Sequence, residues 1–336
     1  MKKILILAAV VWLFLTGMPS PKAFQEIDQE RDHPLGKPVS SLIIWENDEE
    51  FLAICSKYQT AVRMAAFQTT LPDPLPGEEY NVGLAAKILA GTVVPPEKIF
   101  SMNQAVGPRT LQRGFRQGPA YSGTNIIKVI GGGICKVSST LYNTAVMANL
   151  KIVERWPHGM LVPYVPPGQD ATISYGSRDF KFKNTTGKPI LIWAEKVGNT
   201  LYVAFYGGVI PPKVTWHHQI LRKQNNYVIR KYNHRLPPGE KKVIQRGAEG
   251  IIVKNWITIR YPDGNSVQKN LGTDYYTPMP EIIEVGRSSA AANPAIRFPR
   301  PADNLLPGPR RPAARNFCTS KTGYSQPFPL ISAHRD

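Results

Sequence analysis

The spacing of the apolar residues changes near Lys151, and this change constrains the fold more than any other feature of the chain. Upstream, apolar residues recur at the three- and four-residue spacing of amphipathic helices. Downstream, β-branched and aromatic runs are separated by turn-forming residues, as in KIVERW, ATISYG, DFKFKN, PILIWAEKV and TLYVAFYG. The 31 Pro and 27 Gly are spread through the chain, which argues against a helical bundle. The pattern predicts an α+β domain of short helices and antiparallel strands.

Two helices are expected in this first domain, which we place at residues 67–208. Asn81 precedes an apolar stripe and is expected to act as an N-cap for the first helix. The second helix is expected to follow the glycine run 131–133 and to continue to Asn149. Gly198 and Asn199 are expected to form the tight turn between the last two strands.

Residues 211–286 form a second unit that is all strand in pattern, with Asp263 and Gly264 expected at a hairpin turn. This small all-β unit contains no Cys and no carboxylate pair near a His, so we interpret it as a binding or spacer module. Residues 287–336 are rich in Pro and Arg and almost free of acidic residues, which predicts a disordered basic tail.

The N-terminus has the order of a secretory signal. Two lysines precede an apolar run from Ile4 to Leu15, and helix-breaking residues follow it. The run is shorter than the roughly 20 residues that span a bilayer comfortably. We expect residues 1–24 to be a signal peptide or an N-terminal anchor, and residues 25–66 to be a linker and N-terminal region. The chain is then extracytoplasmic, secreted or anchored at the cell wall, and contacts membrane only through this segment.

Charge and cysteine content limit the partners. The 41 Lys and Arg exceed the 24 Asp and Glu by 17, which should draw the chain toward polyanions. Outside the membrane these are anionic wall polymers and lipid headgroups, so export argues against nucleic acid. Cys55, Cys135 and Cys318 are too few and too scattered for a disulfide scaffold, and their odd number leaves at least one thiol without an internal partner.

Cys135, in the segment GGGICKVSST, is the candidate nucleophile. The helix predicted after the glycines points its unpaired N–H groups and its positive dipole end at the sulfur, which favours the thiolate. Lys136 adds a positive charge beside it. The N–H groups from Ile134 to Val137 are candidates for holding an oxyanion, within a loop that includes Gly132 and Gly133.

His158 is the nearest ring in sequence that could serve as the base for this thiol, since a helix and an antiparallel return would bring it back toward Cys135. Both residues have a plainer interpretation. Cys135 could be a small buried residue at a helix start, and His158 could be a polar loop residue.

Arg109, Arg113 and Tyr121 surround the motif in sequence and are candidate substrate-binding residues, because guanidinium groups suit the forked recognition of carboxylates. Either Arg could equally be a solvated or buttressing loop residue. The glycine run fails as a phosphate loop because Cys, not Gly, precedes the Lys. The His residues lack zinc-ligand spacing, so no metal or cofactor is expected.

Four blocks in order resemble the VanW family over about residues 67–207: IFSMNQAVGPRTLQRGF, GGGICKVSSTLYN, HGMLVPYVPPGQDATISYGSRDFKFKN and PILIWA. The segment from about residue 225 to 286 resembles the G-five module, with VIQRGAEG and a later YPDG turn. The family takes its name from a vancomycin-resistance gene cluster. The pairing is common in exported proteins of Gram-positive-type bacteria, and the resemblance implies that the G-five module binds cell-wall sugars.

The resemblance also implies an activity, because some VanW proteins are L,D-transpeptidases that use the Cys of the GGG-x-C motif. Cys135 would attack a peptidoglycan tetrapeptide stem, release the terminal D-Ala and form a 3→3 cross-link. Ser138 and Ser139, in the same motif, join the candidate substrate-binding residues. The family usually has Gln where this chain has Lys136, which tunes the thiolate, holds a substrate carboxylate or marks altered activity. The alternatives are a non-catalytic wall-binding protein and an envelope assembly factor.

Overall fold

The computed structural model describes residues 36–71, 73–123 and 125–286. The expected signal segment at 1–24 and the expected basic tail at 287–336 lie outside the described residues. Within the described ranges, no helix is both long and apolar enough to cross a membrane.

A five-stranded antiparallel sheet forms the centre of the first domain, in the order β1-β2-β10-β9-β3. Strands β9 and β10 pair as the predicted hairpin, with Val197 opposite Thr200 across the Gly198-Asn199 turn. The alternation of side chains along β10 places Phe205 on one face and Ala204 on the other. The strand bounds are Lys37–Pro38 (β1), Val62–Thr70 (β2), Thr200–Gly207 (β10), Ile190–Val197 (β9) and Thr92–Val94 (β3).

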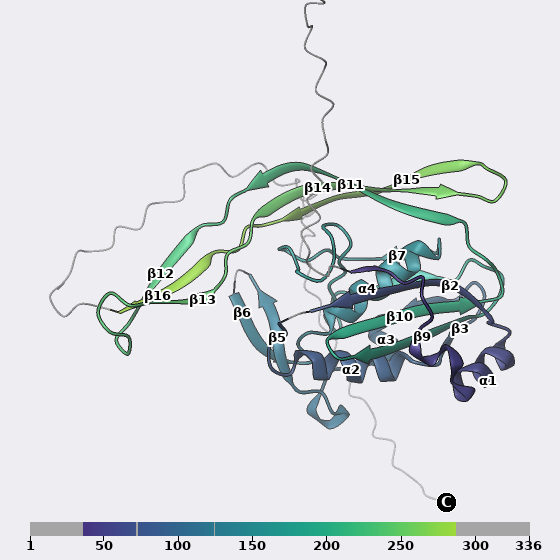
Figure 1. Ribbon diagram of the computed structural model, residues 1–336, viewed down its shortest axis with the longest axis horizontal. Helices are drawn as coiled ribbons and strands as arrows, with labels where there is room; N and C mark the ends of the chain where they lie inside the picture. Colours follow the sequence, from purple (N-terminus) through teal and green to yellow (C-terminus); the bar gives the residue numbers. More distant parts are fainter. Residues whose placement is uncertain (1–35, 72, 124, 287–336) are drawn as a thin grey trace, which may run out of the picture. The chain divides into compact units, whose positions relative to one another are not determined.

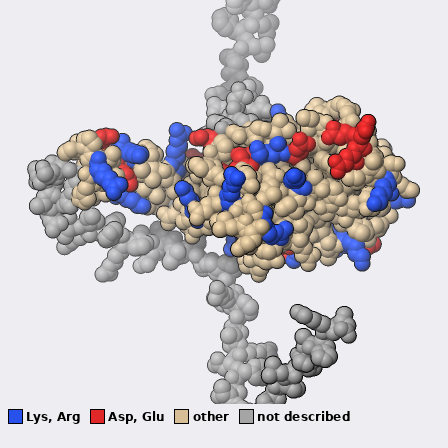
Figure 2. Space-filling model, turned by 90° about the horizontal axis from the view of Figure 1, so that it is seen from below, with Lys and Arg blue, Asp and Glu red and all other residues tan. Residues whose placement is uncertain are grey.

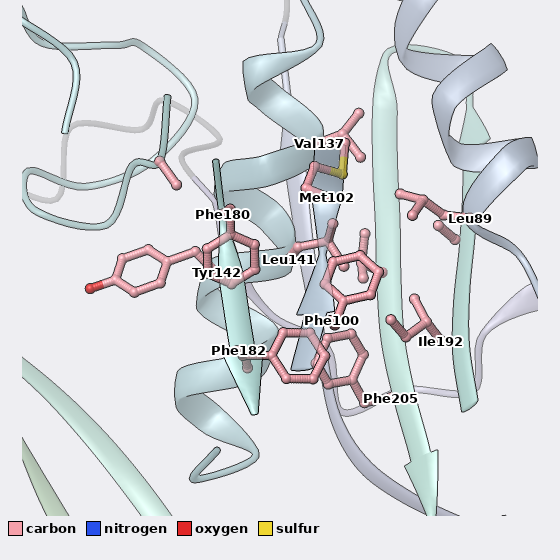
Figure 3. Packing of buried hydrophobic residues seen from close by; sticks show 14 of the residues in the cluster. Leu89, Phe100, Met102, Val137, Leu141, Tyr142, Phe180, Phe182, Ile192 and Phe205 are labelled. Atoms are coloured by element: carbon pink, nitrogen blue, oxygen red, sulfur yellow. The ribbon is translucent and has the colours of Figure 1, made fainter. Parts of the chain in front are cut away.

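Helices α2 (Glu78–Leu89) and α4 (Cys135–Met147) cover one face of this sheet. Helix α2 packs against β9, and α4 packs against β2 and β10. Figure 3 shows the core between them, where aromatic side chains meet aliphatic side chains of the helices and the sheet. Full burial of each large apolar side chain contributes about 1.5–3 kcal/mol to folding, so this layer fixes where the first turn of α4 lies. The labelled core residues are Leu89, Phe100, Met102, Val137, Leu141, Tyr142, Phe180, Phe182, Ile192 and Phe205.

The opposite face is covered by the 3₁₀ helix η1 (Ile44–Asn47) and helix α1 (Glu49–Tyr58). Trp45, Phe51 and Cys55 are buried there against the sheet. The described part of the region that we expected to be a linker therefore belongs to the domain, since the adjoining β2 is a central strand of its sheet. The acidic residues between Glu46 and Glu50 made this region look polar in sequence, although apolar side chains beside them pack inward.

The capping role expected of Asn81 is wrong. Helix α2 begins at Glu78, after Gly77 in the left-handed conformation, so Asn81 lies inside the helix and is fully buried. Its side-chain amide donates to the backbone oxygens of Arg116 and Gly132, each at 2.9 Å, and its side-chain oxygen accepts from the Arg116 N–H at 2.9 Å. The side chain therefore holds the glycine loop rather than its own helix.

Smaller elements complete the domain. The segment ATISYG was predicted as a strand, but only a single bridge between Ser174 and Arg178 forms there. Other backbone N–H groups of the segment bond to a loop carbonyl group and to a side-chain hydroxyl group instead of to a neighbouring strand. The other elements are a three-stranded sheet β4-β8-β7 (Ile99–Ser101, Lys181–Lys183, Lys151–Glu154), the hairpin β5-β6 (Gln117–Ser122, Asn125–Ile130), helix α3 (Met102–Val106) and the 3₁₀ helix η2 (Leu111–Arg113).

Residues 213–286 form the predicted small all-β module, with two three-stranded sheets (Figure 1). The turn at Asp263 and Gly264 joins two strands of the first sheet as expected. In the second sheet β12 runs parallel to β16, while the other pairings are antiparallel. The sheets are β11-β14-β15 (Lys213–Gln224, Gly250–Arg260, Ser266–Tyr276) and β12-β16-β13 (Val228–Asn233, Glu281–Gly286, Lys241–Gln245).

The glycine run before α4 packs against backbone on two sides. A Cβ atom at Gly132 would lie 2.1 Å from the carbonyl oxygen of Gly118 and 2.6 Å from that of Pro119. Gly133 has φ +94°, a conformation that other residues rarely adopt. This turn therefore requires glycine, and it directs the chain from β6 into the first turn of α4.

We predict that Gly132→Ala destabilises the protein by about 1–3 kcal/mol, because the added methyl group meets rigid backbone. Gly159→Ala is the matched control, since Gly159 has no positive φ and a Cβ there meets nothing within 4 Å. Thermal unfolding of the two variants measures the difference. Equal stability of Gly132→Ala and the wild type would contradict the packing described for this turn.

Candidate active site

Cys135 is the first residue of α4, and it lines a cavity of about 810 Å³. The cavity walls come from the glycine turn, the β5-β6 hairpin and the loop that follows β7. The sulfur lies 3.5 Å from Thr172 Oγ1 and 3.8 Å from the carbonyl oxygen of Ile173. The thiol is free and partly exposed, so a substrate in the cavity can reach it.

His158 lines the same cavity, and its side chain interacts with Cys135 so as to lower the pKa of the thiol. Its Nδ1 lies 2.6 Å from Asp170 Oδ2, and its backbone N–H donates to the same oxygen at 2.6 Å. With Nδ1 bound to the carboxylate, the other ring nitrogen is left for the sulfur. Cys135, His158 and Asp170 thus have the connectivity of a nucleophile, a base and a carboxylate that orients the base.

The charges in this chain favour the thiolate. Burial pushes the pKa of the Cys135 thiol up, but the hydrogen bond and the charge of His158 outweigh it and bring the pKa to about 7. Burial alone would lower the pKa of His158, yet Asp170 and Cys135 raise it to about 9. The thiolate and the imidazolium therefore stabilise each other between these values.

The carboxylate oxygen of Asp170 that does not bind His158 Nδ1 also has hydrogen-bond partners. Burial acts to raise the pKa of its carboxyl group, but His158, Arg155 and Tyr276 lower it to about 2. Arg155 Nη2 donates to Asp170 Oδ1 at 3.0 Å, and the hydroxyl group of Tyr276 donates to the same oxygen. The carboxylate is thus ionised and fixed in orientation over the whole range in which His158 titrates.

The structure places Ser138 and Ser139 beneath the site rather than in the cavity. Both are fully buried in α4. The hydroxyl group of Ser138 donates to the carbonyl oxygen of Ala171 at 2.5 Å, and that of Ser139 donates to the carbonyl oxygen of Cys135 at 2.8 Å. The N–H of Ala171 in turn donates to Ser139 Oγ at 2.9 Å. These two side chains thus bind the backbone of the residue next to Asp170, and neither lines the cavity.

Arg109 and Tyr121, two of the candidate substrate-binding residues, line the cavity. Arg109 Nη1 donates to Asn103 Oδ1 at 2.7 Å, whereas its buried Nε and Nη2 atoms have no hydrogen-bond partner within the described residues. Burial lowers the pKa of Arg109, which stays charged at physiological pH. Tyr121 faces His158 edge-on, with ring centroids 6.4 Å apart. Arg113 does not line this cavity.

Lys136 points away from the thiol, so it neither tunes the thiolate by contact nor faces a substrate in the cavity. Its side chain is fully buried, and Nζ lies 2.6 Å from Glu79 Oε1 and 2.9 Å from the carbonyl oxygen of Asn199. The backbone at the helix start also differs from our expectation. The N–H groups of Lys136 and Val137 donate within the turn, at 3.1 and 2.9 Å.

The N–H of Ile134 is engaged as well, by the carbonyl oxygen of Gly131 at 3.4 Å. For the N–H groups of Gly133 and Cys135, no backbone or side-chain acceptor is found among the described residues. Within the predicted range from Ile134 to Val137, the Cys135 N–H is therefore the one donor without an acceptor among the described residues, and the Gly133 N–H just outside that range is a second. The loop positions Gly132, Gly133 and Ile134 all line the cavity.

Sequence reasoning missed Asp170, which lies twelve residues after His158 in a loop without regular structure. An acidic residue soon after a candidate base was the available signal. Arg155 and Tyr276 gave no such signal, because their role depends on tertiary contacts. Across the described ranges, no group of three or more His, Cys, Asp or Glu side chains is arranged to hold a metal ion.

Charged side chains are distributed unevenly on the surface. Figure 2 shows Lys and Arg scattered over one face, with the largest group of Asp and Glu near one end and smaller acidic groups elsewhere. The basic residues on this face form no continuous stripe of the kind that tracks a nucleic-acid backbone.

Comparison with known proteins divides the chain into two parts. Residues 77–206 match the family model described as VanW like protein, and residues 224–288 match the G5 domain. The chain contains a VanW-like domain followed by a G5 domain. The VanW-like domain holds Cys135, His158 and Asp170, while Tyr276 belongs to the G5 domain.

Two curated proteins are similar to this chain. The uncharacterized protein YoaR of Bacillus subtilis (strain 168) is 40% identical over 159 residues, which cover 47% of this chain and 51% of that protein. The vancomycin B-type resistance protein VanW of Enterococcus faecalis (strain ATCC 700802 / V583) is 30% identical over 120 residues, which cover 34% of this chain and 43% of that protein. The chain thus spans about half the length of these relatives.

Two solved structures of G5 domains also match. The IgA1 protease G5 domain is 22% identical, with a TM-score of 0.16, and the match covers 22% of this chain and 90% of that one. The HP0197-G5 structure is 18% identical, with a TM-score of 0.14, and the match covers 22% of this chain and 99% of that one.

We predict that alkylation of Cys135 by iodoacetamide rises with pH through a midpoint near 7, because the pKa of this thiol is lowered to about 7. His158→Ala should move the midpoint up toward the ordinary thiol pKa of about 8.5. Mass spectrometry of the peptide that contains Cys135 measures the rate. A wild-type midpoint at the ordinary value would contradict the ion pair.

We also predict that Lys136→Met lowers the free energy of unfolding by about 3–5 kcal/mol, because it leaves the largely buried Glu79 carboxylate without its partner. The pH midpoint of Cys135 alkylation should stay unchanged. Lys87→Met, at an exposed position of α2, is the control and should change neither quantity. A shifted midpoint in Lys136→Met would show that this lysine acts on the thiol after all.

Proposed function

We propose that this protein is an exported, cell-wall-associated acyltransferase that uses Cys135 as its nucleophile, and that its reaction is L,D-transpeptidation of peptidoglycan stem peptides to form 3→3 cross-links. The observation that carries the proposal is the Cys135–His158–Asp170 arrangement in an open cavity, where the pKa of the thiol is lowered to about 7 and the pKa of the imidazole is raised to about 9, so that the ion pair is favoured between these values.

Acylation would begin with the Cys135 thiolate attacking the carbonyl carbon of the L-centre at the third residue of a tetrapeptide stem. The N–H groups of Gly133 and Cys135, which have no acceptor among the described residues, would donate to the oxyanion that forms. The C–N bond then breaks, and the imidazolium of His158 gives its proton to the departing D-Ala amine. The products are a thioester on Cys135, neutral His158 and free D-Ala.

Transfer would reverse these roles. The side-chain amine of a second stem attacks the thioester carbonyl carbon and loses a proton to His158. The C–S bond breaks, so that Cys135 leaves as the thiolate beside a newly charged imidazolium. Both steps together conserve protons and require no metal or cofactor. Asp170 orients His158 in each step and stays ionised throughout.

Arg109 supports the choice of substrate. Its side chain lines the cavity, and two of its guanidinium nitrogen atoms have no hydrogen-bond partner among the described residues; such a group fits a carboxylate, which the terminal D-Ala of the stem carries. Burial makes this pairing stronger than it would be in water. Because the carboxylate leaves with D-Ala, this contact would hold the donor stem until D-Ala departs.

The domain composition supports the location. The VanW-like domain and the G5 domain, with a relative that carries a vancomycin-resistance name, favour a protein associated with the cell wall. We propose peptidoglycan stems and glycan as the partners, and the net charge of +17 also favours adhesion to anionic wall polymers. A non-catalytic wall-binding protein would share these partners, so chemistry must separate the two functions.

We predict that the purified protein converts tetrapeptide muropeptides to products that lack D-Ala or to 3→3 dimers, and that Cys135→Ala does neither. Asp170→Asn should lower the rate by about 10⁴-fold, since the orienting carboxylate is lost. A carbapenem should acylate Cys135 in the wild type. Liquid chromatography with mass spectrometry measures all three results.

Cys55→Ala is the matched control, because Cys55 is buried on the opposite face of the central sheet and should not affect turnover. An inert wild type in which the carbapenem never labels Cys135 would contradict the enzyme. Equal wall binding by wild type and Cys135→Ala, weakened by salt in both, would then favour the binding protein.

A further inference from the structure

The G5 domain contributes side chains to the support of the candidate active site. At the end of β15, the hydroxyl group of Tyr276 donates to Asp170 Oδ1 and accepts from the backbone N–H of Gly168 at 2.9 Å. Tyr276 is only 4% exposed. The Tyr276 hydroxyl group thus connects the oxygen of Asp170 that does not bind His158 Nδ1 with the backbone of the loop that carries Asp170.

A second contact runs through Arg155. Asp274 Oδ1 accepts from Arg155 Nη1 at 2.6 Å, while Arg155 Nη2 donates to Asp170 Oδ1 at 3.0 Å. The other oxygen of Asp274 accepts from Asn255 Nδ2 at 3.2 Å. The guanidinium group therefore lies between a carboxylate of the VanW-like domain and one of the G5 domain.

A third contact reaches the residue after the candidate base. Both the backbone N–H and the hydroxyl group of Thr277 donate to the carbonyl oxygen of Gly159, each at 2.7 Å. Residues at and just after the end of β15 thus contact both sides of the His158–Asp170 hydrogen bond. Asp274 and Tyr276 act on the Asp170 side, and Thr277 binds the residue after His158.

We propose that Tyr276 and Asp274 of the G5 domain are positioning residues for Cys135, His158 and Asp170, so that the Asp170 carboxylate of the VanW-like domain is held in place by the neighbouring domain. Asp170 offers one oxygen to His158, and it can do so in a fixed direction only if the other oxygen is restrained. Tyr276 and Arg155 supply that restraint, and Asp274 fixes Arg155. The inference rests on the proposed function, because it assigns these residues to the same site.

If this is so, a side chain of the G5 domain affects the reactivity of Cys135 in the VanW-like domain, which a simple spacer domain would not do. Without the hydroxyl group of Tyr276, the Gly168 N–H loses its acceptor and Asp170 Oδ1 keeps only Arg155. The carboxylate is then freer to rotate, and the imidazole ring that depends on it is less often directed at the sulfur. The thiolate loses part of the imidazolium charge that stabilises it.

The test uses the full chain and compares Tyr276→Phe with Tyr275→Phe. The two variants make the same change one residue apart, but Tyr275 is 66% exposed. Tyr276→Phe should slow the alkylation of Cys135 near neutral pH by about 3- to 10-fold and move its pH midpoint upward. Tyr275→Phe should match the wild type in both. Far-ultraviolet circular dichroism and thermal unfolding establish that each variant is folded.

Asp274→Asn is the second variant, and it serves if Tyr276→Phe does not fold. It keeps the shape of the side chain but removes the charge that pairs with Arg155, so a smaller upward shift of the midpoint is expected. A folded Tyr276→Phe, or in its place a folded Asp274→Asn, with the wild-type rate and midpoint would overturn this inference alone. An ordinary midpoint in the wild type itself would overturn the proposed function and this inference together.

Discussion

The hydrogen bond from His158 to Asp170 is the interaction on which the rest of the site depends. It fixes which nitrogen of the ring faces the sulfur, and it raises the pKa of His158 so that an imidazolium persists beside the Cys135 thiolate. Without it, Cys135 would be a partly buried thiol at the start of a helix, and burial would favour its neutral form. The surrounding structure serves to keep this bond in one geometry.

Two parts of the fold converge on that geometry. The central sheet and its buried aromatic layer fix the axis of α4, while the glycine turn places Cys135 at the end of the helix where N–H groups are unpaired. From α4, Ser138 and Ser139 reach back to the backbone next to Asp170. The same helix thus carries the nucleophile and anchors the loop that carries its partners.

Local pattern was enough to predict what depends on local chemistry. The helix after the glycine run, the hairpin at Gly198-Asn199 and the turn at Asp263-Gly264 all follow from periodicity and turn residues, and all are confirmed. The proximity of His158 to Cys135 also followed from a helix and its antiparallel return.

The rest depended on contacts between distant residues. Asn81 has the chemistry of a cap, but tertiary hydrogen bonds recruit it to the glycine loop. Lys136 follows Cys135 in sequence and was expected to place a charge beside the thiol, but on the helix its side chain points toward Glu79. Asp170 and Tyr276 are 106 residues apart and meet only because two domains pack together, which no local pattern encodes.

The central claim is that Cys135 forms a covalent acyl-enzyme. Mass spectrometry of the intact protein, taken within the first turnovers on a tetrapeptide stem that lacks an acceptor amine, tests it most directly. The account predicts an added mass equal to the stem without its terminal D-Ala, carried on the peptide that contains Cys135 and released by hydroxylamine. A protein that binds the stem but gains no mass under any of these conditions would contradict it.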